Sequence, residues 1–460
     1  MNRKRFLCYI AIMSIVLSFF SCAKSSLPTT QQAFNVDDHI NAFIKPLIDS
    51  SKVAGVTVGV AKGDSVLFLK SYGYADIEIK RALPTDATFE IASVTKPFTA
   101  IAVLQLAEKK LLGLDDDIRE YIQFNSKAKV VTIRQLLDHT SGIKDYTRSG
   151  IPSKLEGTAY AKDTIVQMLE KEAFEFEPGT AMSYSNSGYF MLGLIIEKVT
   201  GLSYEEYLKQ NVFSQAEMKS TCDCESIIRG PNNLAEGYNM NKAGHLVRVK
   251  PGDFKMASAA GSLCSTAEDL LNWSNTLHHS DKILSKDSYR AMVSPSTLAD
   301  GTALRYGLGL EINNYKGNKF VSHHGVIEGY LSDIKYFPAY GLTVVTLINT
   351  LGPIKPKDVT NTIAEHFIEN KETVKTFAGD LSPFVGAYSG KVMGRELTRT
   401  FEAEGKQLSI SIGEEKQLLT YMGNNSWKSE DDYIYSFTQQ KDMKVQISAP
   451  LMSLTFTKVE

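Results

Sequence analysis

A serine and a lysine three residues apart, Ser93 and Lys96, have the residue types and the spacing that nucleophilic catalysis needs. A serine hydroxyl becomes a useful nucleophile when a neighbouring base takes its proton. A lysine can be that base if burial or nearby positive charge lowers its pKa from about 10.4. With Pro97 in the first turn of a helix, the three-residue spacing would put both side chains on one face. The start of such a helix also offers free N–H groups to a developing oxyanion.

The Ser-x-x-Lys pattern alone is weak evidence because it occurs five times, at residues 21–24, 93–96, 126–129, 141–144 and 332–335. The surroundings favour the second occurrence. From Ser93 to about Leu112 the chain is apolar on nearly all sides, which predicts a buried helix rather than an amphipathic one. Burial of this kind would lower the pKa of Lys96.

A second polar group follows a predicted turn at Pro178 and Gly179. Tyr184 and Asn186 come next, directly before a helical pattern. A turn in this position can aim a phenol and an amide into a cleft.

A third group, His323-His324-Gly325, ends a strand-like run. Because side chains alternate across a strand, His324 is expected on the face opposite His323, in packing or at the surface. His139, in an Asp-His-Thr-Ser-Gly segment, is expected to hold a helix-to-loop corner by hydrogen bonds.

These groups must be positioned by a mixture of helices and strands. The apolar periodicity predicts helices at residues 36–47, 93–112, 132–138, 187–199, 204–211, 266–277 and 358–368, and strands at 56–60, 66–69, 306–311, 319–323, 330–337 and 342–347. Strands near both ends with helices between them predict an α/β domain whose sheet edges come from distant segments.

The pattern of apolar residues changes after a polar segment at residues 369–373. Residues 408–412, 443–447 and 452–456 alternate between apolar and polar side chains, and glycine and asparagine turns separate them. This pattern predicts a separate small antiparallel β-domain with a boundary near residue 376.

In order along the chain, Ser93-x-x-Lys96, Tyr184-x-Asn186 and His323-x-Gly325 resemble the signature motifs of the serine β-lactamase and penicillin-binding-protein superfamily. The stretches 89–96, 135–142, 178–186, 260–270 and 306–309 are also similar to landmarks of that family, and the resemblance spans residues 37–371. It implies a β-lactamase/transpeptidase-like fold, with an antiparallel sheet flanked by helices and a helical subdomain. Residues 377–460 resemble the lipocalin-like β-domains appended to several such hydrolases.

The resemblance implies roles for the first two motifs. Ser93 would be the acylated nucleophile, Lys96 its proton acceptor, and Tyr184 the group that activates Ser93 or the deacylating water. Asn186 would hold the substrate amide.

For the third motif, the resemblance places His323 where many lactamases keep a lysine for the substrate carboxylate. Gly325 would leave room for a strand-like substrate. The oxyanion hole would combine the N–H of Ser93 with one near Val326 or Ile327.

Tyrosine in the second motif is similar to the branch with class C lactamases, D,D-peptidases, D-aminopeptidases and esterases. A neutral histidine in the third motif binds a carboxylate less strongly than lysine does, which disfavours β-lactam hydrolysis. We therefore expect a serine hydrolase of a D-amino-acid peptide, a β-lactam or an ester. The alternative is a non-catalytic cell-envelope lipoprotein that binds its partners with the same fold.

The amino terminus predicts export. Residues 2–5 are basic, residues 6–20 form an apolar run too short to span a bilayer comfortably, and Ser21 precedes Cys22. This arrangement resembles the lipobox of bacterial lipoproteins and predicts a signal peptide at 1–21, lipid attachment at Cys22, a polar tether at 22–36 and a membrane-anchored location in the cell envelope. The alternative is an ordinary signal peptide with an incidental cysteine.

Composition excludes some classes of function. Lys and Arg number 50 against 52 Asp and Glu, which does not indicate a nucleic-acid partner. The five cysteines lack the spacing of a zinc site, and neither a metal nor a cofactor is expected. Cys222 and Cys224 are expected either to bridge each other or to be free, and Cys264 to be a small buried apolar residue.

Overall fold

The computed structural model describes residues 36–156, 160–228, 233–250, 252, 254–373, 375–392, 395–413 and 415–459. The predicted signal peptide and Cys22 lie outside the described residues. Within the described part of the chain, no helix is both long enough and apolar enough to cross a membrane.

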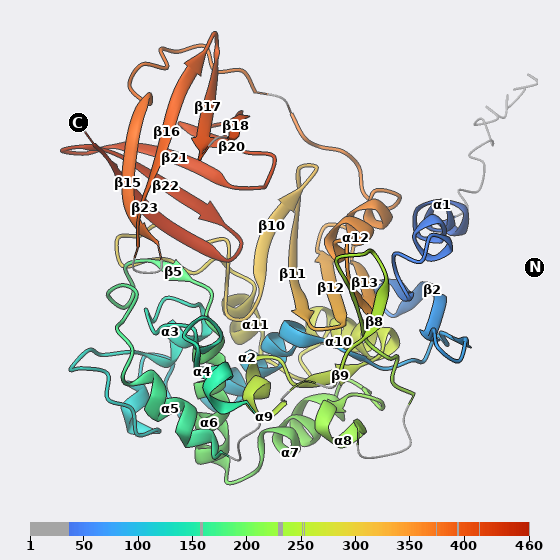
Figure 1. The fold of residues 1–460 in the computed structure, drawn as a ribbon. Helices are drawn as coiled ribbons and strands as arrows, with labels where there is room; N and C mark the ends of the chain where they lie inside the picture. Colours follow the sequence, from blue (N-terminus) through green and yellow to red (C-terminus); the bar gives the residue numbers. More distant parts are fainter. Residues whose placement is uncertain are drawn as a thin grey trace, which may run out of the picture.

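A seven-stranded antiparallel sheet organises the larger, first part of the chain (Figure 1), in the order β10-β11-β12-β13-β1-β2-β3. Its strands are β1 (Gly55–Lys62), β2 (Ser65–Asp76), β3 (Arg81–Ala82), β10 (Glu311–Tyr315), β11 (Asn318–Ile327), β12 (Tyr330–Phe337) and β13 (Leu342–Ile348). The first strand pairs with the last, with Val56 opposite Ile348. The two ends of this domain therefore meet within one sheet, and the edges come from distant segments as predicted.

Helices cover both faces of the sheet. On one face, α1 (Val36–Asp49) and α12 (Pro356–Ala364) pack on the valines of β1 in a continuous apolar cluster. The other face packs on α2 (Thr95–Glu108), α10 (Ala267–His279) and the helical region below the sheet in Figure 1.

The remaining elements of this domain are mostly short, although α6 (Asn186–Thr200) has 15 residues. The helices are α3 (Ile133–Leu137), α4 (Ile151–Leu155), α5 (Lys162–Leu169), α6 (Asn186–Thr200), α7 (Tyr204–Leu208), α8 (Cys224–Ile228), α9 (Phe254–Ala257) and α11 (Lys286–Met292). The strands are β4 (Phe89–Glu90), β5 (Met182–Ser183), β6 (Cys222–Asp223), β7 (Tyr238–Met240), β8 (Leu246–Arg248), β9 (Leu263–Ser265) and β14 (Thr350–Leu351).

The expected β-lactamase/transpeptidase-like α/β architecture is confirmed, with two local corrections. The helix predicted from Ser93 begins at Thr95, and Ser93 itself lies in the preceding 3-10 turn, Ala92–Val94. The strand predicted at 306–311 is wrong, because the Gly307 N–H bonds to the Leu310 carbonyl at 2.8 Å and forms a tight turn. The strand starts only at Glu311.

The carboxyl-terminal part is an antiparallel β-domain, as expected (orange to red in Figure 1). Its strands are β15 (Gly386–Val392), β16 (Arg395–Glu404), β17 (Gln407–Ile412), β18 (Glu415–Leu418), β19 (Thr420–Gly423), β20 (Ser426–Lys428), β21 (Ile434–Gln439), β22 (Met443–Ala449) and β23 (Met452–Lys458). The first strand pairs with the second and with the last, so the sheet curls around an aromatic core that contains Trp427. The predicted boundary near residue 376 lies between α12 and β15, and the lipocalin-like assignment stays a prediction.

The alternatives expected for Cys222 and Cys224 are wrong, whereas Cys264 is buried as expected but is bonded to another cysteine. Cys224 is bonded to Cys264, 40 residues away, and Cys222 is the free thiol among the described cysteines. The reason is the pairing of β6 with β9, which places Cys222 opposite Cys264 and brings Cys224 to its side. Spacing along the chain could not reveal this pairing, because it depends on two strands that meet only in the folded protein.

Candidate active site

Ser93 lies at the junction between the sheet and the helical region. Its 3-10 turn precedes α2, and the residue before it, Ala92, has a left-handed φ of +47° although it is not glycine. Such a conformation is strained and persists when its surroundings hold it. Here the Ile91 N–H donates to the Leu263 carbonyl at 3.0 Å, directly before the turn. The Ser93 side chain is partly exposed, whereas its neighbours Ala92 and Val94 are buried.

Gly325 allows β11 to approach this turn closely. A Cβ atom at Gly325 would lie 2.3 Å from the Ile91 carbonyl oxygen and 2.4 Å from the Ser332 hydroxyl. Any side chain at Gly325 would therefore push β11 away from the 3-10 turn that carries Ser93. The space predicted for a strand-like substrate at the Gly325 Cα is taken by the protein's own backbone.

Lys96 is completely buried one turn beyond Ser93. Its Nζ contacts three oxygen atoms: the Ser93 hydroxyl at 3.2 Å, the Asn186 Oδ1 at 2.8 Å and the Ala260 carbonyl at 2.7 Å. Burial lowers the pKa of Lys96 from 10.5 to about 7, and the nearby Asp145 carboxylate opposes this shift. A substantial fraction of Lys96 is therefore uncharged at neutral pH.

The three contacts fix the direction of the Lys96 lone pair. A neutral amine has two N–H donors and one lone pair, and of its three neighbours the Asn186 Oδ1 and the Ala260 carbonyl can only accept. The two N–H groups therefore bind these acceptors, and the lone pair faces Ser93, whose hydroxyl can donate. This arrangement suits removal of the Ser93 proton.

Asn186 is held from the other side by an acidic residue. Its Nδ2 donates to the Asp145 Oδ2 at 3.1 Å, which fixes the amide orientation and presents Oδ1 to Lys96. Asp145 in turn accepts from the main chain and side chain of Thr147. One N–H of the Asn186 amide remains for a ligand.

Tyr184 lies over the same lysine. The Lys96 Nζ is 4.7 Å from the centre of the Tyr184 ring, and the His139 ring is 4.4 Å from it. Burial holds the pKa of Tyr184 well above its usual value, and the nearby Ser93 hydroxyl partly offsets that rise. The Tyr184 hydroxyl is buried beside the Ser93 hydroxyl, and no hydrogen bond to any other described residue engages it.

The main chain around Tyr184 is tied at three points. The Ser183 N–H donates to the His139 carbonyl at 3.1 Å, and the Ser185 N–H donates to the His139 Nδ1 at 3.2 Å. The predicted role of His139 in holding a corner by hydrogen bonds is thus confirmed. The Tyr184 N–H donates to the Leu451 carbonyl of the C-terminal domain at 3.1 Å.

His323 is buried among aromatic side chains beside the site. Its Nδ1 faces the His324 carbonyl at 2.7 Å and therefore donates, and its Nε2 accepts from the Tyr306 hydroxyl at 3.1 Å. Burial lowers the pKa of His323 to about 3. Both ring nitrogens are thus used within the protein, and the third motif places no positive charge at the site.

His324 lies on the opposite face of β11, as expected for an adjacent strand residue. Its Nδ1 contacts the buried Glu311 carboxylate at 2.6 Å. The charge of Glu311 raises the pKa of His324. Burial alone would raise the pKa of Glu311, but its interactions with His324 outweigh this effect and lower the pKa to about 2. The two side chains form an ion pair.

A cleft of about 730 Å³ separates the two domains and is lined by residues of β10, β11, β12, the start of α12 and the C-terminal domain. Val326 and Leu451 lie in its wall. β10 pairs with β11 only as far as Ser322, so residues 323–327 have no strand partner on that side among the described residues. This free main-chain edge adjoins the Ser93 turn.

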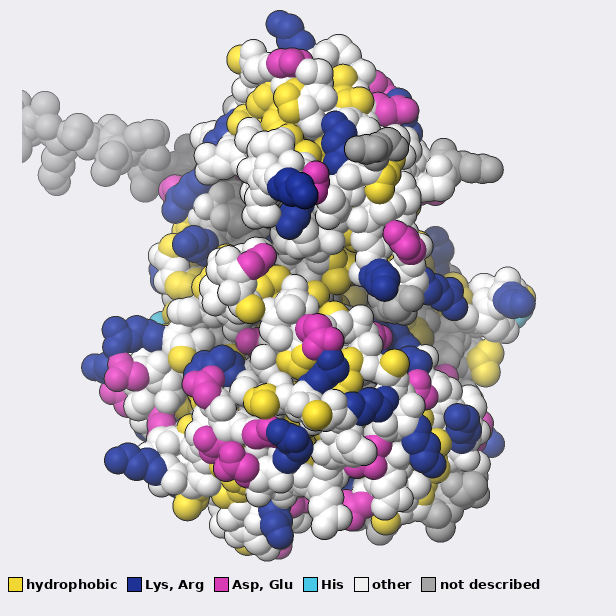
Figure 2. Space-filling model, turned by 90° about the vertical axis from the view of Figure 1, so that its left-hand side faces the viewer, with side chains coloured by type: hydrophobic (Ala, Val, Ile, Leu, Met, Phe, Trp, Pro, Cys, Tyr) yellow, Lys and Arg dark blue, Asp and Glu magenta, His cyan; other side chains and the backbone are white. Residues whose placement is uncertain are grey.

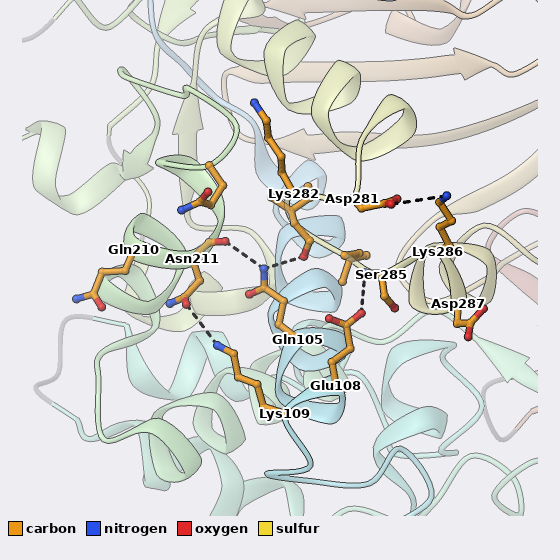
Figure 3. Close-up of a pocket in the computed structure, with 13 residues that line it drawn as sticks. Gln105, Glu108, Lys109, Gln210, Asn211, Asp281, Lys282, Ser285, Lys286 and Asp287 are labelled. Carbon is orange, nitrogen blue, oxygen red and sulfur yellow. Dashed lines mark hydrogen bonds and ion pairs between the residues drawn. The ribbon is translucent and has the colours of Figure 1, made fainter.

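A second hollow, of about 720 Å³, lies near the far end of α2 (Figure 3). Some of its polar side chains are engaged within the protein: the Gln105 amide donates to the Asn211 and Ile283 main-chain carbonyls, and Lys286 pairs with Asp281. None of the predicted site residues lines it. Figure 2 shows basic and acidic side chains interspersed over one face of the molecule.

The structure thus brings Ser93, Lys96, Tyr184 and Asn186 into contact and places His323 behind them. Sequence reasoning missed the groups that orient these side chains, namely Asp145, the Ala260 carbonyl, Tyr306 and Leu451. Ala260 and Tyr306 lie in the family-like stretches 260–270 and 306–309, but no local signal indicates their contacts, and none marks Asp145 or Leu451, because each acts through a contact formed only in the folded protein. Lipidation at Cys22 lies outside the described residues.

Known proteins share this architecture. The β-lactamase family model matches residues 40–367. Penicillin-binding protein 4* of Bacillus subtilis (strain 168) is 30% identical over 348 residues, which cover 73% of this chain and 76% of that protein. The Staphylococcus aureus (strain MW2) protein flp is 27% identical over 361 residues, covering 75% of this chain and 69% of that protein.

Solved structures agree with the sequence relatives. The octameric penicillin-binding protein homologue from Pyrococcus abyssi superposes with a TM-score of 0.65 at 25% identity, covering 91% of this chain and 99% of that one. The D-amino acid amidase from Ochrobactrum anthropi SV3, complexed with D-phenylalanine, gives a TM-score of 0.61 at 25% identity, covering 72% and 98%. Since the family match spans well over half of the chain and includes the Ser93, Lys96 and Tyr184 cluster, the protein belongs to the β-lactamase family of serine hydrolases.

Proposed function

We propose that the protein hydrolyses amide or ester bonds of small D-amino-acid derivatives through an acyl-enzyme on Ser93. The observation that carries this proposal is the fully buried Lys96 Nζ, 3.2 Å from the Ser93 hydroxyl and oriented by two other acceptors. This is the geometry in which a lysine can act as general base.

In the first step, the Ser93 Oγ attacks the substrate carbonyl carbon and its proton passes to the neutral Lys96 amine. The negative charge on the carbonyl oxygen is received by main-chain N–H groups, one from Ser93 and one from the free edge of β11 near Val326. The tetrahedral species then expels the amine or alcohol. The leaving group takes a proton from Lys96 or from Tyr184, whose hydroxyl is free of other good hydrogen bonds.

In the second step, water attacks the ester carbonyl of the acyl-enzyme. The group that gave its proton to the leaving group, Lys96 or Tyr184, now takes the water proton. A proton from Lys96 or Tyr184 then returns to the Ser93 Oγ as the carboxylic acid leaves. The net reaction consumes one water and needs no other reactant. Asn186, whose amide has one uncommitted N–H, would bind the substrate carbonyl.

The third motif supports amide and ester substrates over β-lactams. His323 is neutral at pH 7 and engaged on both nitrogens, so it offers no cation to the carboxylate of a lactam. The similarity to a D-amino acid amidase and to a penicillin-binding protein supports D-configured substrates.

Labelling with a fluorescent fluorophosphonate and a fluorescent penicillin tests the nucleophile. Wild type is expected to be labelled and Ser93→Ala not. Ser126→Ala, which removes the hydroxyl of another Ser-x-x-Lys pair, is the matched control and is expected to label like wild type. Equal labelling of Ser93→Ala and wild type would contradict the assignment.

A substrate panel then tests the class. Turnover of D-phenylalanine amide, a D-Ala-D-Ala peptide and a p-nitrophenyl ester is expected to exceed that of nitrocefin, with L-phenylalanine amide as the stereochemical control. If the wild type labels but turns over nitrocefin fastest, the enzyme is a β-lactamase. If nothing is labelled or turned over, the fold serves binding alone.

We further propose that Cys22 carries a lipid and holds the enzyme in the cell envelope, facing the periplasm or the cell surface. The basic residues 2–5, the apolar run 6–20 and Ser21 before Cys22 support this proposal. Labelled palmitate is expected to enter wild type and Cys8→Ala but not Cys22→Ala. Label in Cys22→Ala would contradict it.

A further inference from the structure

The C-terminal β-domain reaches the catalytic tyrosine through a single hairpin. The β22–β23 turn, Pro450 and Leu451, projects from that domain toward β5, and Figure 1 shows β23 running down to this strand. Met452 lies opposite Ser183 and Ser453 opposite Met182 in an antiparallel pairing. β5 is thereby added to the sheet of the C-terminal domain, directly before Tyr184.

The hairpin tip bonds to Tyr184 itself. The Leu451 carbonyl accepts the main-chain N–H of Tyr184 at 3.1 Å. On the other side of the residue, Arg148 donates to the Tyr184 carbonyl at 3.1 Å. The hydrogen bonds to His139 fix only the neighbours of Tyr184, so the C-terminal domain supplies the acceptor for the N–H of the tyrosine.

The Leu451 side chain seats the tip in an apolar cluster of the catalytic domain. It packs on buried Met182, Leu298, Leu304 and Tyr306. Tyr306 is the residue whose hydroxyl binds the His323 Nε2. One side chain of the hairpin thus packs beside both the tyrosine segment and the third motif.

Other contacts hold the domain in this place. The Arg305 Nη1 donates to the Asp432 carbonyl at 2.6 Å, and the same guanidinium forms an ion pair with the Asp432 carboxylate. Phe176 and Ala181 of the catalytic domain belong to the aromatic core of the β-domain. The C-terminal domain therefore docks on the catalytic domain through both polar and apolar contacts, and not through the hairpin alone.

We infer that the β22–β23 hairpin is a positioning element for the catalytic tyrosine and that Leu451 is its positioning residue. The inference rests on the proposed function for its effect on turnover. Without the tip, the Tyr184 N–H would lose its acceptor and the tyrosine could move relative to Ser93 and Lys96. Proton transfer needs hydrogen-bond distances, so a small displacement lowers the rate of chemistry more than the affinity for substrate.

The test shortens the hairpin by one residue pair. Residues 449–452 are replaced by Asn-Gly, which joins the paired Ser448 and Ser453 through a favourable two-residue turn and removes the Leu451 carbonyl. The matched control shortens the exposed β16–β17 hairpin in the same way. There Asn-Gly replaces residues 404–407 and joins the paired Ala403 and Leu408.

The hairpin variant is expected to lose at least about tenfold in kcat, with KM within about twofold of wild type, while the control keeps both. Amide hydrogen exchange at Tyr184 is expected to accelerate in the hairpin variant only. Unchanged kcat, or unchanged exchange at Tyr184, would overturn the inference.

Point variants decide the matter if the shortened hairpin does not fold. Leu451→Gly is expected to lower kcat and to speed exchange at Tyr184, and Leu451→Met, which retains apolar volume, to restore both toward wild type. Equal behaviour of the two variants would overturn the role of the side chain. The exchange measurement needs no turnover, so it tests this inference even if the proposed activity fails, and labelling of wild-type Ser93 tests that activity alone.

Discussion

The Lys96 Nζ lies 3.2 Å from the Ser93 hydroxyl, and the entire Lys96 side chain is buried from solvent. Burial removes water from around the charged form of Lys96, so the neutral amine is populated near pH 7. A charged lysine cannot accept the serine proton. The protonation state of this one side chain is therefore expected to control the rate.

The first prediction concerns the pH dependence of turnover. Because burial lowers the pKa of Lys96 to about 7 and the proposed mechanism uses the neutral amine, kcat/KM is expected to rise with pH and to level off above about pH 7. Rates of ester hydrolysis measured from about pH 5 to about pH 9 would show this rise, the acidic limb of the pH–rate profile. His323, with a pKa of about 3, cannot cause it. A limb near the usual lysine pKa would contradict the prediction.

The second prediction uses two substitutions that change the charge around Lys96 in opposite directions. Asn186→Asp adds a carboxylate beside the amine and is expected to move the acidic limb up by at least about one pH unit. Asp145→Asn replaces an existing carboxylate by an amide of nearly the same shape. Because that carboxylate raises the pKa of Lys96, the substitution is expected to move the acidic limb to lower pH. The same pH series measures both, and shifts in one direction for both variants would rule out Lys96 as the titrating group.

The local part of this site could be predicted from the sequence. Ser93 and Lys96 are three residues apart on an apolar segment, and Tyr184 and Asn186 both follow one predicted turn, so spacing together with the apolar surroundings places each pair. Their assembly into one site, and the fold that supports it, follow from the resemblance to a family. Apolar periodicity also predicts most helices and most strands of the seven-stranded sheet, but not β3 or β10.

What remained hidden depends on contacts between distant segments. The Ala260 carbonyl lies 164 residues from Lys96 in the chain and orients its lone pair, yet a main-chain carbonyl has no sequence signature. The bond between Cys224 and Cys264 needs the pairing of β6 with β9. The Leu451 contact needs a second domain to dock.

The third prediction concerns stability and the His324–Glu311 ion pair. The pKa of His324 is raised above 6.5 in the folded protein, so its contribution is complete below pH 6.5 and is lost as pH rises through the raised value. The lowered pKa of Glu311 gives a contribution that is complete above pH 4.5 and lost only as pH falls through about 2. The pair therefore stabilises most between pH 4.5 and pH 6.5.

His324→Gln is accordingly expected to lower the free energy of unfolding by about 1 kcal/mol near pH 6, and by less near pH 9, because part of the side chain faces solvent. Urea unfolding at the two pH values measures the difference. His245→Gln, at an exposed histidine, is the control and should show no such difference. An equal loss at both pH values would contradict the ion pair.

The fourth prediction concerns the disulfide. Loss of the Cys224–Cys264 bond, which closes a loop of 40 residues, is expected to lower the free energy of unfolding by about 2–4 kcal/mol. Thermal unfolding of Cys264→Ser measures this loss, and Cys222→Ser, which removes the free thiol, should unfold like wild type. Peptide mapping without reduction should recover the 224–264 pair. Recovery of a 222–224 pair would show a different connectivity.

The pairing of β5 with β23 also bears on how the enzyme is made. Met452 follows Met182 by 270 residues, so the strand that completes the tyrosine segment is synthesised last among the described elements. Pairing segments so far apart in the sequence is slow, because the entropy lost in closing the long loop opposes the contact. On refolding, helical signal should therefore return before hydrolytic activity. A chain still being synthesised would carry Ser93 and Lys96 before the strand beside Tyr184 exists, so its hydrolysis is expected to stay slower until both domains have emerged.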